Sequence, residues 1–254
     1  MRDRFQAMIE RLRHDPRVVL DEAYLGPPAP PETLLRADSA FGAPLAPAIR
    51  DFYAETNGVC VRWSVAGVPG PEADPDASTP DWNERGLASQ GGAIVLWPLE
   101  KVLDTDWTEI LHFSWMSDAE EGPTLDGVPS RLASHARSLR PFDLFSDVQK
   151  AAWVLSPGSG DPPVVLLEDY SNSGDSRVLR FGDYLELLLK YHGQYPSRAA
   201  FLLDYPSRGT RVDAPRSYWE TLAEIDLAAR ALTNGEVAAT FTAHMGPKAP
   251  RRPS

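Results

Sequence analysis

The sequence predicts an α+β domain, with a mostly antiparallel twisted sheet and helices packed against it. Some segments carry apolar residues at helical spacing, whereas others alternate or cluster them as strands do. The order of these segments is helix, helix, strands, helix. The 254 residues include 24 prolines and 18 glycines, which are spread over many loops. We therefore expect short elements joined by tight turns.

Two helices are predicted ahead of the first predicted strand. An apolar stripe over residues 31–41 ends at Gly42, and a second stripe over 47–56 begins at a proline, which suits the first position of a helix. Asn57 and Gly58 follow that second stripe, and both residue types tolerate the left-handed backbone that ends a helix. The second helix is therefore expected to stop at this pair.

The remaining elements are predicted from alternation, short apolar runs and helical stripes. Strands are expected over 59–65, 93–97, 151–157, 163–170 and 176–181, and helices over 98–104, 181–193 and 216–232. A Gly/Pro turn joins 151–157 to 163–170, so this pair is expected to form a hairpin.

The expected organisation is one main domain with a segment at each end. Residues 1–31 are predicted to be an N-terminal helix, which docks on the body, and a stiff proline-rich connector. Residues 32–192 form the main domain, with an acidic insertion at 66–130. Residues 193–254 are expected to be a helical extension followed by a disordered, proline-rich tail.

The negative charge of the chain is concentrated in one quarter of its length. The formal net charge is −11, from 36 acidic and 25 basic residues. Residues 66–130 contain thirteen acids and two bases, so the rest of the chain is balanced. Such a segment repels phosphates, which argues against nucleic acid as a partner, and attracts basic proteins.

Sequence motifs for catalysis or metal binding are weak. The single cysteine, Cys60, excludes an internal disulfide and is expected to be a structural thiol within a strand, and the five histidines lack metal-ligand spacing. Residues 169–175 imitate a calcium loop, but Arg180 replaces its glutamate ligand, so a turn is the better interpretation. We expect no catalytic residue, no cofactor and no metal, and interpret the chain as a non-enzyme.

Targeting signals are also lacking. No run of eighteen apolar residues is present, and the first residues do not have the pattern of a secretory signal. We expect a cytoplasmic protein without membrane association.

The stretch 104–121 sets aromatic residues among acids, as the centre and rim of a protein interface do. The candidate partner-binding residues are Asp104, Trp107, Glu109, Trp115, Asp118, Glu120, Glu121 and Asp126. The alternative is that the aromatic side chains belong to the core and the acids to a solvated face. Composition does not decide between these two interpretations.

Several short motifs occur in the order found in one known family. They are Gly42 with Leu45, then Asn57-Gly58, then Trp97-Pro98-Leu99, and finally Phe181-Gly182-Asp183-Tyr184-Leu185. In this order they resemble the SUKH superfamily, which includes fungal cell-wall synthesis regulators and many bacterial immunity proteins. The resemblance covers residues 32–192, although the Leu-Pro pair of the family is loosened here to Leu-Ala-Pro.

This resemblance implies a non-enzymatic, protein-binding domain. The role it most commonly implies is that of a bacterial immunity protein, which binds and occludes a cognate toxin such as a nuclease. A basic nuclease would also be attracted by the acidic segment. The alternative is an intracellular regulatory or scaffold protein of the cell-wall synthesis regulator type.

Overall fold

The computed structural model describes residues 1–66, 79–80, 82, 91–107, 124–125, 128–129, 138–146, 149–168 and 180–193. Its helices are α1 (Arg2–His14), α2 (Pro31–Phe41), α3 (Pro47–Glu55), α4 (Leu99–Asp104) and α6 (Phe181–Tyr191). Its strands are β1 (Val18–Leu25), β2 (Val59–Val65), β3 (Gly91–Leu96), β4 (Thr124–Leu125), β5 (Val128–Pro129), β6 (Leu139–Asp143), β7 (Gln149–Val154) and β8 (Val164–Glu168).

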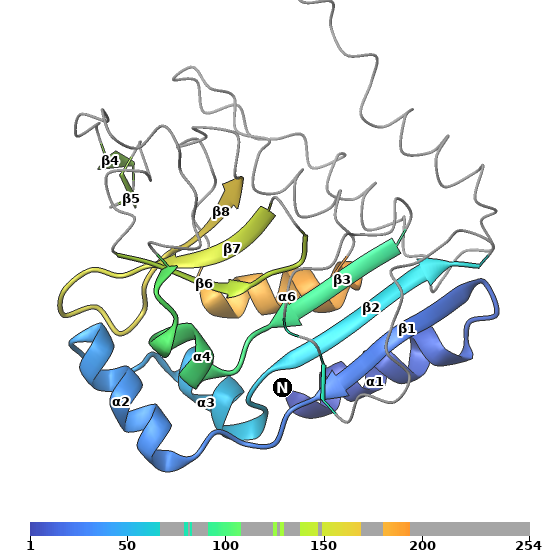
Figure 1. Ribbon diagram of the computed structural model, residues 1–254, viewed down its shortest axis with the longest axis horizontal. Helices are drawn as coiled ribbons and strands as arrows, with labels where there is room; N and C mark the ends of the chain where they lie inside the picture. The colour runs from blue at the N-terminus through green and yellow to red at the C-terminus, as the bar shows by residue number, and fades with distance from the viewer. Residues whose placement is uncertain are drawn as a thin grey trace, which may run out of the picture.

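Six of the strands form one antiparallel sheet in the order β1-β2-β3-β6-β7-β8 (Figure 1). Strands β4 and β5 pair with each other in a separate ribbon. Helices α1 and α6 lie behind the sheet in Figure 1, whereas α2, α3 and α4 gather at one end of it. The predicted α+β class is confirmed.

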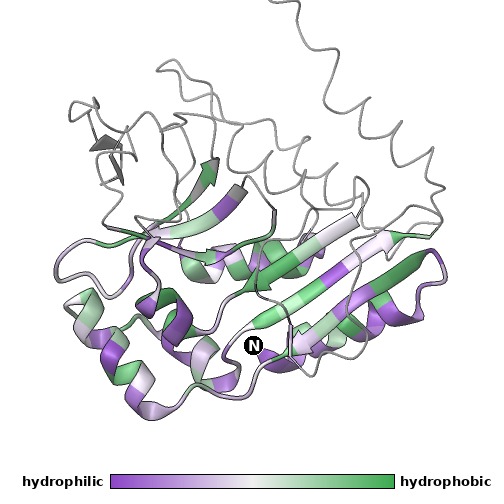
Figure 2. Ribbon diagram, in the orientation of Figure 1, coloured by the Kyte–Doolittle hydropathy of each residue, from purple (hydrophilic) through white to green (hydrophobic). Residues whose placement is uncertain are grey.

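Most of the predicted elements are present. Helix α2 ends at Gly42, whose φ of 69° places it in the left-handed region that favours glycine. The predicted hairpin is formed by β7 and β8. The strand expected over 176–181 lies mostly outside the described residues, and Phe181 begins α6. Helices α1 and α2 alternate green and purple along their length in Figure 2, as amphipathic helices do.

The core is centred on aromatic rings from both helices and strands. Phe142 of β6 stacks on Trp153 of β7, with ring centroids 4.5 Å apart. Phe181 of α6 contacts both Phe142, at 5.3 Å, and Phe52 of α3, at 5.5 Å. Edge-to-face and offset stacked pairs of this kind stabilise a core beyond the burial of area alone. The cluster fixes α3 and α6 against the β6–β7 half of the sheet.

The N-terminal segment packs on the core and on the sheet. Helix α1 docks as predicted, and it buries Phe5, Met8, Ile9 and Leu12 in the common core. The prediction missed β1, which pairs with β2 from Val18↔Val65 to Leu25↔Val59. Residues 1–31 therefore supply both a helix and an edge strand of the main sheet.

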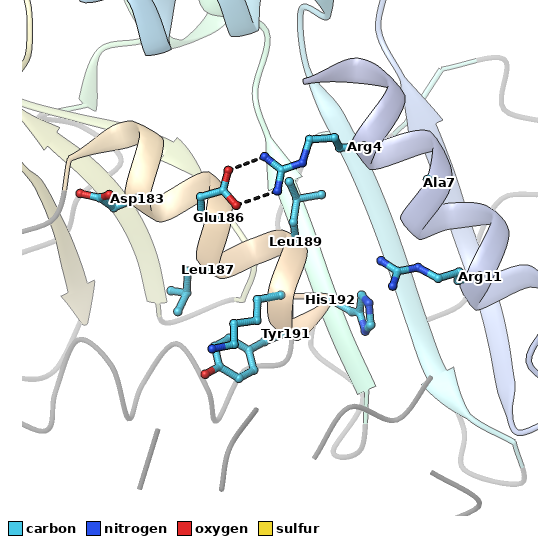
Figure 3. Close-up of a pocket in the computed structure, with 10 residues that line it drawn as sticks. Arg4, Ala7, Arg11, Asp183, Glu186, Leu187, Leu189, Tyr191 and His192 are labelled. Carbon is cyan, nitrogen blue, oxygen red and sulfur yellow. Dashed lines mark hydrogen bonds and ion pairs between the residues drawn. The ribbon is translucent and has the colours of Figure 1, made fainter. Parts of the chain in front are cut away.

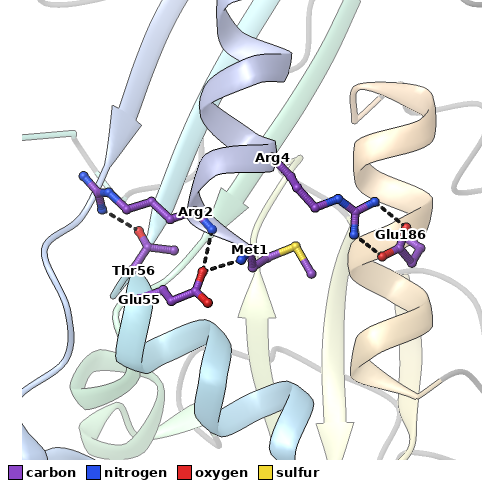
Figure 4. Close-up of polar contacts among 6 residues, drawn as sticks. All are labelled: Met1, Arg2, Arg4, Glu55, Thr56 and Glu186. Carbon is purple, nitrogen blue, oxygen red and sulfur yellow. Dashed lines mark hydrogen bonds and ion pairs between the residues drawn. The ribbon is translucent and has the colours of Figure 1, made fainter.

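The proline-rich connector is pinned to the end of α3. The backbone N–H of Gly26 donates to Gly58 O at 2.9 Å, and that of Asn57 donates to Pro27 O at 2.7 Å. Figure 4 shows Arg2 reaching the same junction, where its guanidinium donates to the Thr56 hydroxyl at 3.3 Å. The connector is therefore a fixed part of the domain.

The end of α3 differs from the prediction in one respect. Thr56 leaves the helix in an extended conformation, and the left-handed residue is Gly58, with φ of 106°. A Cβ at Gly58 would meet the Trp82 ring at 3.0 Å, so space as well as backbone favours glycine there. Asn57 has no positive φ. Its side chain instead binds the start of α4.

The two halves of the sheet, β1-β2-β3 and β6-β7-β8, meet at a short junction. The only paired residues of β3 and β6 are Leu96 and Asp143. The Asp143 carboxylate is fully buried, and its Oδ1 accepts the Val95 N–H at 2.8 Å. Its Oδ2 accepts the hydroxyl of Tyr184, on α6, at 2.6 Å. One carboxylate thus joins β3, β6 and α6.

We expect Asp143→Ala to lower the free energy of unfolding by about 3–5 kcal/mol, because it removes the acceptor of two buried hydrogen bonds. Tyr184→Phe removes one donor only and should cost about 1–3 kcal/mol. Urea denaturation measures both changes. The control is Asp51→Ala, at an exposed position of α3, which should change the free energy of unfolding by no more than about 0.5 kcal/mol. Equal stability of Asp143→Ala and the parent chain would contradict this role.

Asp38 links α2 to α3 through its carboxylate. Its Oδ1 accepts the Leu45 N–H at 2.8 Å, and Arg50 Nη2 donates to its Oδ2 at 2.6 Å. The Leu45 hydrogen bond and then the Arg50 charge hold the pKa of Asp38 below its ordinary value of 3.8. The ionised form is therefore favoured by folding.

A lowered carboxyl pKa contributes stability above the ordinary pKa, and this contribution disappears as the pH falls through the folded-state pKa. Asp38→Asn should therefore lose about 1 kcal/mol at pH 7 and lose less stability than the parent chain on acidification to pH 2.5. Arg50→Met keeps the Leu45 bond and should have a smaller effect. Denaturation midpoints across this pH range test the prediction, and parallel profiles for all three proteins would contradict it.

Candidate functional site

Helix α4 follows β3 within the acidic segment 66–130. The helix starts at Leu99, whose N–H donates to Asn57 Oδ1 at 2.7 Å. The Asn57 amide in turn donates to Glu100 Oε2 at 2.7 Å. Both bonds satisfy groups at the first turn of α4, as a capping side chain does. The start of α4 is thus fixed by a residue 42 positions earlier in the chain.

Trp107 is a core residue. Its side chain is 2% exposed, its indole N–H donates to Val102 O at 2.9 Å, and its ring lies 5.3 Å from that of Trp97. The structure therefore places the Trp107 ring in the core, and its candidate role in partner binding stays a prediction. The alternative interpretation, in which the aromatic belongs to the core, holds for this residue.

Asp104 is on the surface, at the end of α4. Its side chain is 58% exposed and forms an ion pair with Arg36 of α2. Exposed pairs of this kind are weak and leave both side chains accessible. The other six candidates, Glu109, Trp115, Asp118, Glu120, Glu121 and Asp126, lie outside the described residues.

The surroundings of α4 are acidic in the described part of the segment. Glu100, Asp104 and Asp106 accompany a single base, Lys101, whose ammonium lies 5.7 Å above the Trp97 ring. Burial lowers the pKa of the Arg140 guanidinium, and attraction by Asp106 opposes that shift. The acids of this end thus lie beside bases from other elements, Arg36 on Asp104 and Arg140 near Asp106.

A second candidate site is a groove of about 720 Å³ between α1 and α6 (Figure 3). Helix α1 lines it with Arg4, Ala7 and Arg11, which recur at helical spacing. Helix α6 and the residue after it line it with Asp183, Glu186, Leu187, Leu189, Lys190, Tyr191 and His192. No candidate in the sequence prediction belongs to this groove. The sequence signal for this groove is the row of polar or small residues on the exposed face of α1.

One ion pair bridges the two helices across the groove. Arg4 Nη2 donates to Glu186 Oε2 at 2.7 Å, and Nη1 pairs with the other oxygen (Figures 3 and 4). This hydrogen bond and charge keep the pKa of Glu186 below its ordinary value. The pair is exposed on both sides, so it orients the helices more than it stabilises them.

The C-terminal end of α6 is held on the sheet. The Trp63 indole N–H donates to His192 O at 2.7 Å, and the Ala93 N–H donates to Gly193 O at 3.0 Å. A Cβ at Gly193 would lie 2.5 Å from Ile94 Cγ1, and its φ is 69°, so this position requires glycine. The groove therefore has a fixed end where the chain leaves α6.

The described residues do not assemble a metal site or a spanning helix. No group of three or more potential metal ligands occurs among them. Cys60 is buried in β2, as expected for a structural thiol. Within the same residues, no helix is long and apolar enough to cross a bilayer.

Comparisons with known proteins give no relative for this chain. No family model, curated protein or solved structure matches it.

The structure separates the roles of Trp107 and Asp104. We expect Trp107→Ala to lower the free energy of unfolding by about 3–5 kcal/mol, because it leaves a cavity beside Trp97. Asp104→Asn should change it by less than about 1 kcal/mol. Both values can be measured by urea denaturation. If Trp107→Ala kept the parent stability, its assignment to the core would fail.

Proposed function

We propose that the chain is a non-enzymatic protein-binding domain of the SUKH type. In this proposal it is an immunity protein, which binds a basic toxin in the cytoplasm and occludes its working surface. The observation that carries the proposal is the charge of residues 66–130, with thirteen acids and two bases in an otherwise balanced chain. A segment of one sign speeds the encounter with a partner of the other sign.

The anchoring of α4 supports this proposal. The Asn57 cap and the Trp97–Trp107 contact fix the backbone from which residues 108–123 continue. Binding groups that leave a rigid element lose less conformational entropy when a partner orders them. Asp104 is exposed beside this anchor, where it pairs with Arg36 of α2.

The positions of the family motifs are a second support. Gly42 ends α2, Gly58 precedes β2, and Trp97-Pro98 separates β3 from α4. Each motif therefore lies at a boundary between elements, where residue type is restricted by backbone geometry. Shared motifs of this kind indicate a shared fold more than a shared partner.

The test is a growth-rescue assay. The chain is co-expressed with the product of the neighbouring gene as the candidate toxin, and complex formation is measured by pull-down at two salt concentrations. We expect protection from growth arrest, and a complex that weakens as salt rises because charge steering is screened.

A matched pair of triple variants assigns the binding to the acidic segment. Asp118→Asn, Glu120→Gln and Glu121→Gln together should weaken binding at least tenfold and abolish protection. The control is Asp3→Asn, Glu32→Gln and Asp51→Asn, which removes the same charge from exposed positions on α1, α2 and α3. If both variants lost binding equally, the net charge of the chain, and not the acidic segment, would account for the effect. Full protection by the first variant would overturn the proposed surface, and capture of several cellular proteins without protection would favour a regulatory scaffold.

A further inference from the structure

We propose that the outer edge of β1 binds an extended segment of a partner protein, which adds a strand to the main sheet. The segment that fits this edge alternates apolar with basic residues. The inference rests on the position of β1 in the sheet, on the backbone groups that point away from β2, and on the side chains that border them. It does not depend on the acidic segment 66–130 or on a toxin as the partner.

Strand β1 lies at one edge of the six-stranded sheet, with β2 on its inner side (Figure 1). The two strands differ in exposure, since all seven residues of β2 are buried and none of the eight residues of β1 is. Val19 of β1 is 45% exposed. An edge strand that is not covered has a row of backbone N–H and C=O groups to which another strand can bind.

Hydrogen bonds just beyond the two ends of β1 show which of its backbone groups point outward. The Ala66 N–H donates to Arg17 O at 2.8 Å, and the Gly26 N–H donates to Gly58 O at 2.9 Å. Ala66 and Gly58 flank β2, and both have even numbers. Because bonded and non-bonded residue pairs alternate along an antiparallel ladder, the even-numbered residues of β2 are the ones that bond to β1.

The register between the two strands then identifies the outward groups. Val19, Glu22 and Tyr24 face even-numbered residues of β2, whereas Leu20 and Ala23 face odd-numbered ones. The N–H and C=O groups of Leu20 and Ala23 therefore point away from β2. Within the described part of the chain, no backbone hydrogen bond reaches these four groups.

The two ends of the outer row are already in use. The Val18 N–H donates to Asp15 O at 3.0 Å, and Arg2 Nη2 donates to Leu25 O at 3.4 Å. Both bonds agree with the outward direction of these backbone groups. A partner segment is therefore expected to pair with the middle of β1.

One face of β1 is apolar along the whole strand. The side chains on this face are those of Val18, Leu20, Ala23 and Leu25, which lie beside the odd-numbered residues of β2. Val18, Leu20 and Leu25 are partly buried against the core. Apolar side chains of an added strand would cover the parts of these residues that remain exposed.

The other face of β1 carries two adjacent acids, Asp21 and Glu22. The Glu22 carboxylate forms an ion pair with Arg62 of β2. Two acids beside one base leave this part of the edge negative in a chain whose net charge is −11. Basic side chains of an added strand would be cross-strand neighbours of these acids, and opposite charges in such positions attract. The two faces together select a segment that alternates apolar with basic residues.

A second copy of the chain fits this edge poorly. Two β1 strands paired about their middle would set Asp21 and Glu22 of one copy beside those of the other, and like charges in cross-strand positions are destabilising. Each copy would also bring its register shift between Leu20 and Glu22, and such bulges hinder edge-to-edge pairing. A basic partner segment brings neither the second pair of acids nor the second bulge.

Amide hydrogen exchange in the full chain tests the geometry and the binding. Without a partner, the N–H groups of Leu20 and Ala23 should exchange rapidly, and that of Tyr24, which faces β2, should exchange slowly. The probe is a peptide of four Lys-Val repeats with blocked ends. An excess of this peptide should slow exchange at Leu20 and Ala23 at least tenfold and leave Tyr24 unchanged. Rapid exchange at Leu20 and Ala23 with the peptide present would overturn the proposal.

Two substitutions at one exposed position separate backbone pairing from attraction by charge. Ala23→Pro removes an outward N–H, which an edge strand tolerates, whereas Ala23→Val keeps it. Fluorescence anisotropy of the labelled Lys-Val peptide measures the affinity. We expect Ala23→Pro to weaken binding at least tenfold and Ala23→Val to change it less than threefold. Thermal unfolding checks that both variants are folded.

A peptide of four Glu-Val repeats is the control for the chemistry of the partner, and it should bind at least tenfold more weakly than the Lys-Val peptide. Equal affinity of the two peptides would contradict the basic character of the segment. Equal affinity of Ala23→Pro and Ala23→Val for the Lys-Val peptide would show binding by charge alone and overturn the proposal. Dimers of the chain that Ala23→Pro dissociates would assign the edge to a second copy, and would also overturn it.

Discussion

The buried carboxylate of Asp143 is the constraint on which the rest of the fold depends. Strands β3 and β6 share a single residue pair, and backbone bonds from Trp97 N–H to Phe142 O and from Leu144 N–H to Val95 O flank it, so the junction between the two halves of the sheet is short. The carboxylate adds one bond to the Val95 N–H and one to the Tyr184 hydroxyl. A buried polar group is tolerated only where hydrogen bonds replace its hydration, and here those bonds also fix α6 across the junction. The aromatic cluster packs on the β6–β7 side of this junction.

The sequence predicts the regular elements well and fails where a strand is interrupted. The strand β2 and the helices α2 and α3 follow clear periodicities, and they are where the pattern places them. The two strands that sequence analysis misses in the main sheet, β1 and β6, both contain a shift of register, next to Asp21 in β1 and Phe142 in β6. An extra residue in a strand breaks the alternation on which recognition of a strand depends. β6 also contains a proline, which argues further against a strand.

The candidate sites show a different limit of sequence analysis. Trp107 is of a residue type that is common at interfaces, and its burial beside Trp97 places it in the core. The α1–α6 groove is formed by residues as far apart in the chain as Arg4 and Glu186, so no local pattern reveals it. The distribution of charge along the chain, in contrast, can be counted in the sequence because it does not depend on tertiary contacts. The acidic segment could therefore be identified before the fold was known.

The division of the sheet into two meanders has a consequence for how such a protein can diversify. Each half consists of strands that follow one another, β1-β2-β3 and β6-β7-β8, and neighbours within a half are paired antiparallel. Among the described residues, the chain between Leu96 and Leu139 adds no strand to this sheet. Lengthening that stretch would leave every register unchanged, and the entropic cost of a longer loop rises only with the logarithm of its length. The acidic stretch after α4 can therefore gain, lose or exchange residues during evolution while the scaffold that carries it stays the same.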